Sequence, residues 1–219
     1  MYQEEGMKMP RSNSRTKRTL PVFIGQVDRQ KHQLDDQQPY TQYQTWLAET
    51  SGMLGCPINC QYCFFQLDGY TPVQPEVGLT PREIVDKLGE QPTYMPEMPV
   101  HYGSKTDAFS TKRTIDYYAQ VLQYYGESNY PNPLVFITKR SIPDEIMALA
   151  LSIKQPVFFY LSFSGLGGTA IEPTVDSEVI KDNFVRLKAK ELFAVHYWRP
   201  FLPQNSTQEK TLKQALKPG

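Results

Sequence analysis

The sequence predicts an α/β protein built on a parallel β-sheet. From Tyr43 onward, apolar runs of strand length alternate with segments whose apolar residues recur at helical spacing, and this alternation is typical of parallel strands joined by crossover helices. A chain of 219 residues is long enough for one domain with a sizeable core. We therefore predict one α/β domain over residues 41–219, preceded by a basic and polar arm over residues 1–40 that we expect to be flexible.

Five segments have the pattern of β-strands. The third is rich in β-branched and aromatic residues, and the fourth is dominated by apolar ones, as expected of strands inside a sheet. In chain order, the predicted strands are Tyr43–Ala48, Met98–Tyr102, Leu134–Thr138, Val157–Phe163 and Leu192–Tyr197.

The first two helices carry clear boundary signals. Thr80 and Glu83 form a capping box with Pro81 at the first helical position, and Gly89 is a stop signal. Apolar residues then recur at helical spacing over 115–125 before Gly126, which we expect to end the second helix.

Three further helices are predicted after the later strands. Ser141 is the expected cap of a helix that runs to about Leu151, with Pro143 and Asp144 in its first turn. Residues 179–187 have the apolar spacing of the next helix, and a capping box that starts at Ser206 begins the last one.

Composition excludes some classes of function. Lysine plus arginine and aspartate plus glutamate both number 23, so no global charge attracts the protein to nucleic acid or to an anionic membrane. No apolar run reaches the roughly 18 residues of a membrane-spanning helix, and the N-terminus lacks the apolar segment of a signal peptide. We expect a cytoplasmic protein, since three cysteines with this spacing suit a metal in a reducing compartment rather than disulfides.

The three cysteines of the chain, Cys56, Cys60 and Cys63, lie together in the pattern C-x3-C-x2-C. Three thiolates can hold three irons of a 4Fe-4S cluster and leave the fourth iron open. A structural zinc site instead needs four protein ligands, and His101 is the available fourth ligand. From the residues alone, an iron-sulfur cluster and a zinc-stabilised binding module without catalysis both remain open.

With Tyr62 before the last cysteine, this motif resembles that of the radical S-adenosylmethionine (radical SAM) superfamily. The resemblance implies a 4Fe-4S cluster on the three cysteines, S-adenosyl-L-methionine (SAM) on the open iron, and an electron donor such as flavodoxin or ferredoxin. It further implies reductive cleavage of SAM to a 5'-deoxyadenosyl radical that abstracts hydrogen from a substrate.

The implied fold is a partial (β/α)6 TIM-like barrel with outer helices. Only five strand-helix units are visible in the sequence. Because an open parallel edge is prone to aggregation, we expect the chain to be a fragment of a longer protein.

Residues that follow the predicted strands are the candidates for binding SAM, because ligands of parallel α/β proteins lie at the carboxyl ends of the strands. The segment 103–107, G-S-K-T-D, departs from the Gly-Gly-Glu motif of many radical SAM proteins and is similar to the G-S-x-T-D of the spore photoproduct lyase-like branch. The resemblance implies that this segment holds the methionine amine. The candidate residues are Gly103, Ser104, Thr106 and Asp107. A glycine turn beside a helix start is the structural alternative.

The later strand ends supply the other candidates. Lys139, or its neighbour Arg140, would reach the SAM carboxylate, as a lysine does in lyase-like relatives. Ser162 and Ser164 precede a glycine-rich turn and suit the ribose, and Arg199 resembles the arginine of an R-P-x-x-P segment that would clamp oxygens of SAM or substrate. The lyase-like branch points to nucleic-acid repair, although the neutral charge and the absence of a fourth cysteine argue against it, and the substrate stays open.

Overall fold

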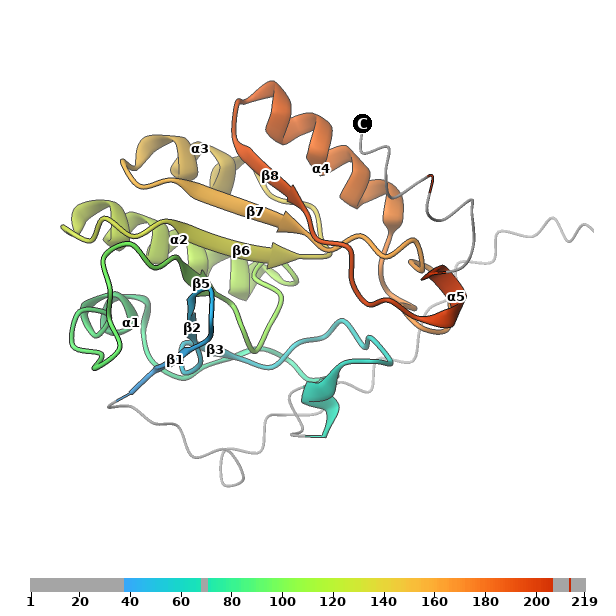
Figure 1. Cartoon of the computed structure of the whole chain (residues 1–219), viewed down its shortest axis with the longest axis horizontal. Helices are drawn as coiled ribbons and strands as arrows, with labels where there is room; N and C mark the ends of the chain where they lie inside the picture. Colours follow the sequence, from blue (N-terminus) through green and yellow to red (C-terminus); the bar gives the residue numbers. More distant parts are fainter. Residues whose placement is uncertain (1–37, 68–70, 207–212, 214–219) are drawn as a thin grey trace, which may run out of the picture.

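The computed structural model describes residues 38–67, 71–206 and Lys213. Its centre is a six-stranded sheet in the order β1-β2-β5-β6-β7-β8 (Figure 1). Strands β2, β5, β6, β7 and β8 are parallel, and β1 pairs with β2 in antiparallel orientation. The strands are β1 (Tyr40–Gln42), β2 (Leu47–Glu49), β5 (Val100–Tyr102), β6 (Leu134–Thr138), β7 (Val157–Leu161) and β8 (Phe193–His196). The predicted α/β class, with parallel strands and outer helices, is confirmed.

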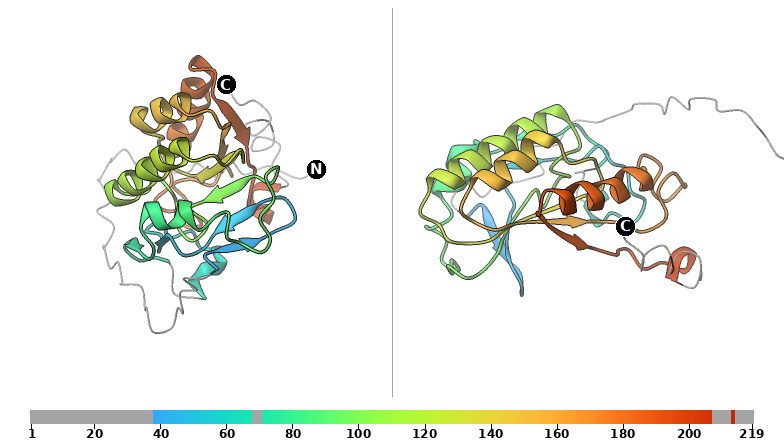
Figure 2. Two further views of the ribbon diagram at one scale, coloured as in Figure 1. Left: turned by 90° about the vertical axis from the view of Figure 1, so that its left-hand side faces the viewer. Right: turned by 90° about the horizontal axis from the view of Figure 1, so that it is seen from above.

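The main helices lie together on one face of this sheet (Figure 2). They are α1 (Pro81–Asp86), α2 (Lys112–Glu127), α3 (Asp144–Ser152) and α4 (Ser177–Ala189). Smaller elements lie outside this layer: a two-stranded sheet of β3 (Met53–Leu54) and β4 (Glu76–Val77), the 3-10 helix η1 (Phe64–Gln66) and the short helix α5 (Pro203–Ser206).

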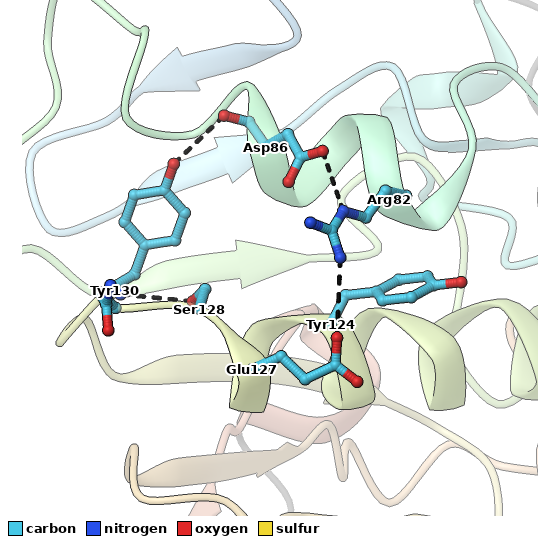
Figure 3. Close-up of a pocket in the computed structure, with 7 residues that line it drawn as sticks. Arg82, Asp86, Tyr124, Glu127, Ser128 and Tyr130 are labelled. Carbon is cyan, nitrogen blue, oxygen red and sulfur yellow. Dashed lines mark hydrogen bonds and ion pairs between the residues drawn. The ribbon is translucent and has the colours of Figure 1, made fainter.

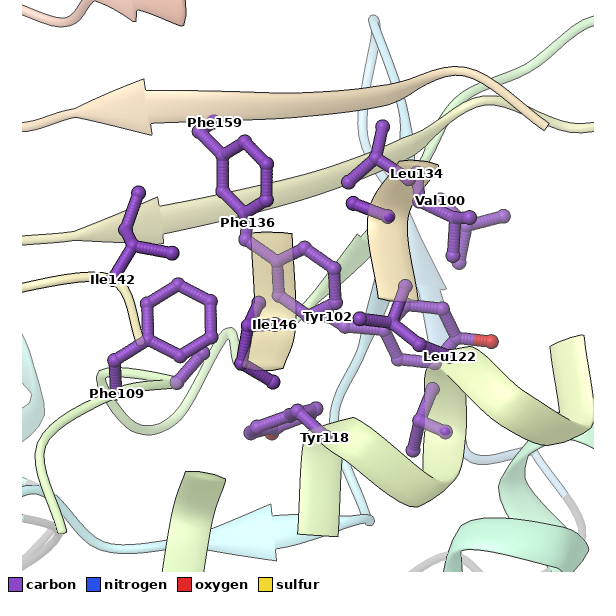
Figure 4. Close-up of a cluster of buried hydrophobic side chains, with 14 of the residues drawn as sticks. Val100, Tyr102, Phe109, Tyr118, Leu122, Leu134, Phe136, Ile142, Ile146 and Phe159 are labelled. Atoms are coloured by element: carbon purple, nitrogen blue, oxygen red, sulfur yellow. The ribbon is translucent and has the colours of Figure 1, made fainter. Parts of the chain in front are cut away.

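Aromatic side chains fill the core between the sheet and the helices (Figure 4). Tyr102, Phe136 and Phe159 come from neighbouring strands and stack across the sheet, with ring centroids 6.2 Å apart in each adjacent pair. They share one face because side chains alternate along a strand and the parallel register places these residues opposite each other. Burial of such rings is a large part of the hydrophobic stabilisation that holds the helices on the sheet.

Two predicted elements agree closely with the structure. The strand Leu134–Thr138 is β6, with the same limits. The capping box that starts α1 is also present, since Thr80 accepts a hydrogen bond from the backbone of Glu83 and the Glu83 carboxylate accepts one from the backbone of Thr80.

The first predicted strand is displaced along the chain. Tyr43 lies in a turn, closed by a 2.9 Å hydrogen bond from its backbone N–H to the carbonyl of Trp46, and this turn joins β1 to β2. The strand β1 was not predicted. Its first residue, Tyr40, lies in the segment assigned to the arm, and residues 1–37 lie outside the described part of the chain.

Two predicted helix boundaries were also wrong. The helix α3 begins after Pro143, whereas the Ser141 hydroxyl oxygen accepts a hydrogen bond from Arg186. Gly126 lies inside α2 instead of ending it, and a Cβ atom there would lie 2.5 Å from a methyl carbon of Ile153. This glycine therefore allows close packing. The helix predicted from Ser206 falls almost entirely outside the described residues.

Candidate functional site

The cysteine loop, residues 55–63, is held against the loops that follow β5 and β7. At its start, the Gly55 N–H donates a 3.2 Å hydrogen bond to the carbonyl of Lys105, and near its end the Gln61 N–H donates a 2.9 Å bond to the carbonyl of Ile171. Strands β6, β7 and β8 run in the same direction (Figure 1). The cysteine loop is thereby fixed to loops at the carboxyl ends of the parallel strands.

The three thiols are free of disulfides; Cys60 is buried, and Cys56 and Cys63 are partly buried. Burial raises the pKa of Cys56 to about 12, with a further contribution from the charge of Asp107, and raises the pKa of Cys60 to about 11. Burial also raises the pKa of Cys63, against which the charge of Arg199 acts. Within the described residues, no three histidine, cysteine or acidic side chains lie close enough together to hold a single metal ion.

Asp107 lies at the centre of the contacts after β5 and β6. Its buried carboxylate accepts hydrogen bonds from the Phe109 N–H at 3.0 Å, the Thr138 hydroxyl at 2.8 Å and the Lys139 N–H at 2.7 Å. Burial raises the pKa of Asp107. In turn, the Asp107 N–H donates to the Cys56 sulfur. Asp107 therefore connects the end of β6 to the cysteine loop.

Lys139, the candidate that follows β6, points into a buried polar cluster. Its ammonium group lies 2.8 Å from the Glu172 carboxylate and donates to the Ser162 hydroxyl at 2.8 Å and to the Ser162 carbonyl at 3.1 Å. It also lies 5.7 Å from the centre of the Tyr62 ring. The structure thus brings Tyr62, Lys139 and Ser162 together, from the cysteine loop and from two strand ends.

Ser164 belongs to the same group of polar side chains, because its hydroxyl donates a 2.5 Å hydrogen bond to the Glu172 carboxylate. The carbonyl of Ser164 accepts a 3.0 Å hydrogen bond from the side chain of Asn205, which also bonds Leu202 and Pro200. Asn205 is fully buried, and it fixes the segment after β8 against the loop after β7.

The turn after β5 is built on Glu49, at the end of β2. The backbone N–H of Gly103, which has a left-handed φ of 82°, donates to the Glu49 carboxylate at 3.2 Å, and the Ser104 hydroxyl donates to the Glu49 carbonyl. Thr106 has a buried hydroxyl without a hydrogen-bond partner. These three candidates lie in the turn whose Lys105 carbonyl accepts the hydrogen bond from Gly55, next to Cys56.

Arg199 lies on an aromatic row on the sheet face opposite the helices. Its guanidinium lies 4.2 Å from the centre of the Tyr197 ring. The row is formed by rings with centroids 5.2 to 6.0 Å apart, namely His101, Trp46, Tyr160 and Tyr197. Burial and the charge of Arg199 lower the pKa of His101 to about 3, and the Nε2 atom of His101 has no hydrogen-bond partner. His101 therefore packs as a neutral ring.

Glu172, Glu49 and Asn205 were not singled out from the sequence, although each is buried and holds several partners. Glu49 directly follows two apolar strand residues, and a charged residue at a strand end was an available signal. Glu172 and Asn205 lie in irregular segments, so no periodicity marks them.

A separate pocket lies between α1 and the end of α2 (Figure 3). Arg82 lies between Asp86 and Glu127 there, at 3.0 and 3.7 Å, with Tyr124 and Tyr130 as further lining residues. None of the candidates for binding a cluster or SAM lines this pocket.

No protein-family model matches this sequence, and no curated protein matches it. Solved structures do. A cysteine-to-serine variant of spore photoproduct lyase superposes with a TM-score of 0.59 and 16% identity, covering 77% of this chain and 51% of that one. The chain has the fold of spore photoproduct lyase.

Other structures of that lyase agree. Its complex with dinucleoside spore photoproduct gives a TM-score of 0.55 at 15% identity and covers 69% of this chain and 45% of the lyase. A variant with bound AdoMet and dinucleoside spore photoproduct gives 0.51 at 16% identity, over 65% of this chain and 42% of that one. The chain spans about half the length of the lyase structures. The resemblance predicted from the cysteine loop is confirmed at the level of the fold.

Proposed function

We propose that this chain is a radical SAM protein that holds a 4Fe-4S cluster on Cys56, Cys60 and Cys63. The observation that carries the proposal is the position of three cysteines without disulfides on a loop fixed to the carboxyl-end loops of a parallel sheet, in a fold shared with spore photoproduct lyase. When bound, the reduced cluster would supply the electron that cleaves SAM to a 5'-deoxyadenosyl radical for hydrogen abstraction.

The donor set suits a cluster better than a single zinc ion. Zinc requires four ligands within about 2.3 Å of one point, and the described residues contain no such compact group. In a four-iron cluster each cysteine binds a different iron, so the three thiolates need not meet at a single ion. His101, the fourth zinc ligand of the alternative, packs against Trp46 with ring centroids 5.2 Å apart.

The chain's own groups would bind SAM from the strand ends. Lys139 offers a cation for the carboxylate, close to Tyr62 of the cysteine loop. Ser162 and Ser164 are the proposed ribose contacts. Because the three protons of the Lys139 ammonium already have acceptors, SAM would share or replace one of them.

The substrate proposal rests on the aromatic row and Arg199. Nucleobases stack on aromatic side chains, and an arginine can hold phosphate or carbonyl oxygens. Three of the similar lyase structures contain a dinucleoside spore photoproduct. We therefore propose a nucleic-acid lesion as the first substrate class to test, with a flavodoxin or ferredoxin as electron donor.

Anaerobic reconstitution with iron and sulfide tests the proposal. We expect about four irons and four sulfides per chain, an electron paramagnetic resonance (EPR) signal after reduction, and 5'-deoxyadenosine when SAM is added. Cys60→Ala should lose the cluster. Lys139→Met should keep the cluster and lose SAM cleavage, whereas Lys188→Met, at an exposed position of α4, should change neither.

The result that refutes the proposal is equally definite. One tightly held zinc per chain, with no cluster and no 5'-deoxyadenosine under reducing conditions, would establish the zinc-stabilised binding module instead.

A further inference from the structure

Glu172 is a buried acid in the loop between β7 and α4, and the proposed function gives it no role. Only 1% of its surface is exposed. Burying a carboxylate is costly unless charges and hydrogen bonds compensate it. The partners of Glu172 therefore indicate what its presence achieves.

Every partner of the Glu172 carboxylate comes from the candidate SAM site. Oε1 accepts from the Tyr62 hydroxyl and lies 2.8 Å from the Lys139 ammonium, while Oε2 accepts from the Ser164 hydroxyl at 2.5 Å. These residues belong to the cysteine loop, the end of β6 and the loop after β7. One carboxylate thus joins three segments that are distant in the sequence.

The backbone beside Glu172 reinforces this connection. The carbonyl of Ile171 accepts the 2.9 Å hydrogen bond from Gln61, next to Tyr62. On its other side, the Glu172 carbonyl accepts from the Gly168 N–H at 3.0 Å, which closes the glycine-rich turn. The second half of the cysteine loop is therefore attached to one segment by both backbone and side-chain bonds.

The Tyr62 hydroxyl donates a hydrogen bond to Glu172 and also lies within hydrogen-bonding reach of the sulfur of Cys60. A phenol has one proton to donate. Because Tyr62 donates it to Glu172, it does not donate it to Cys60. Glu172 therefore controls the hydrogen bonding received by one proposed cluster ligand, and hydrogen bonds to sulfur tune the reduction potential of iron-sulfur clusters.

We infer that Glu172 is a positioning residue of the proposed cluster site. It fixes Tyr62, and through Tyr62 the Cys60–Cys63 half of the cysteine loop, and it holds the Lys139 ammonium close to Tyr62. The inference rests on the proposed function, and nothing in it requires Glu172 to touch the cluster. It predicts two effects of Glu172→Gln, one on the protein without a cluster and one on the reconstituted protein.

The first test measures thiol protection in the full chain without a cluster. Iodoacetamide labelling under anaerobic conditions, followed by mass spectrometry, gives the labelling rate of each cysteine. In Glu172→Gln, we expect Cys60 and Cys63 to react about tenfold faster relative to Cys56, the factor expected for loss of a charge-assisted hydrogen bond that opposes local opening. Glu178→Gln, at an exposed position of α4, should leave the ratio unchanged.

A second variant separates positioning from unfolding. Tyr62→Phe removes the bond to Glu172 but keeps the ion pair with Lys139, so it should retain the wild-type circular dichroism while raising the Cys60 labelling rate. Wild-type ratios in both Glu172→Gln and Tyr62→Phe would overturn the inference. If Glu172→Gln does not fold, a wild-type ratio in Tyr62→Phe alone overturns it, and a raised ratio supports it.

The second test measures the midpoint potential of the reconstituted cluster by EPR-monitored titration. Glu172→Gln removes a negative charge and leaves a weaker, neutral acceptor for the Tyr62 proton, which makes donation to Cys60 easier. Both changes favour the reduced cluster, so the potential should rise. In a Tyr62→Phe background the rise should be smaller. An unchanged potential in Glu172→Gln would overturn the inference. If wild-type protein takes up no cluster, the proposed function fails, and the labelling ratio still decides the role of Glu172.

Discussion

The protonation of His101 should set the acid stability of the fold. The ring is buried, its Nε2 atom has no partner, and burial together with the charge of Arg199 lowers its pKa from 6.5 to about 3. A histidine with a lowered folded-state pKa is neutral in both states above pH 6.5. Below that pH the unfolded chain gains a proton that the folded chain does not, so the free energy of unfolding falls as pH decreases from 6.5 toward 3.

The size of this effect follows from the two pKa values. Between pH 7.5 and 5.0, a pKa of about 3 in place of 6.5 corresponds to a loss of about 2 kcal/mol of unfolding free energy. For a domain of this size, that loss lowers the melting temperature by about 4–8 °C.

Urea unfolding at the two pH values measures this loss. Fluorescence is a suitable probe because Trp46 packs against His101. The control is His101→Gln, which cannot titrate, and the difference between the two proteins removes contributions from other groups. If wild type and His101→Gln lose the same free energy between pH 7.5 and 5.0, the buried neutral imidazole is not the cause and the reasoning fails.

Three further predictions concern the core and the ion pair. Glu172→Gln should lower the free energy of unfolding in urea by about 3–5 kcal/mol, because it leaves the Lys139 ammonium buried without its carboxylate partner. The double variant Glu172→Gln/Lys139→Met should lose less than the sum of the two single changes. Additive losses would contradict the ion pair. Burial raises the pKa of Glu49, so the folded state disfavours ionisation of this carboxyl group. The free energy of unfolding should therefore fall as pH rises just above 4.5, by up to about 1.4 kcal/mol per pH unit. Glu49→Gln should remove this slope, and an unchanged slope would show that Glu49 is not its cause. Gly126→Ala should lower the free energy of unfolding by about 1–3 kcal/mol, because the added methyl group would contact Ile153. The double variant Gly126→Ala/Ile153→Ala should lose less than the sum of the two single changes. A neutral Gly126→Ala would show that the neighbouring segments can move apart.

The elements predictable from sequence were those with strong local signals. A continuous run of β-branched and aromatic residues is sufficient to define β6, and a capping box with proline defines the start of α1. The strand β1 has only three residues and mixed polarity. It depends on distant contacts, since the Tyr40 hydroxyl donates to the carbonyl of Ile84 at 2.6 Å and bonds Tyr102 at 3.1 Å. Local patterns do not encode such contacts.

The candidate site divides in the same way. Lys139 and Ser162 were found because they lie at strand ends, directly after β6 and β7, and a parallel sheet brings its strand ends together. Glu172 lies well beyond the end of β7, in a segment without periodicity, so its position among Tyr62, Lys139 and Ser164 depends on how that loop folds back. A buried acid inside an irregular loop is visible only once the loop is placed.

The charged side chains of Lys139 and Asp107 are already paired, and that affects how a ligand binds. Lys139 has three acceptors, and Asp107 accepts from three donors. At these two residues a ligand therefore gains affinity only by exchanging bonds, such as a carboxylate that shares the Lys139 ammonium with Glu172. Such exchange contributes less to affinity than new contacts would, but it keeps the cationic group in place before the ligand arrives, so that little ordering entropy is lost on binding. Positioning through Glu172 and Asp107 thus favours a rigid site over a strongly attractive one.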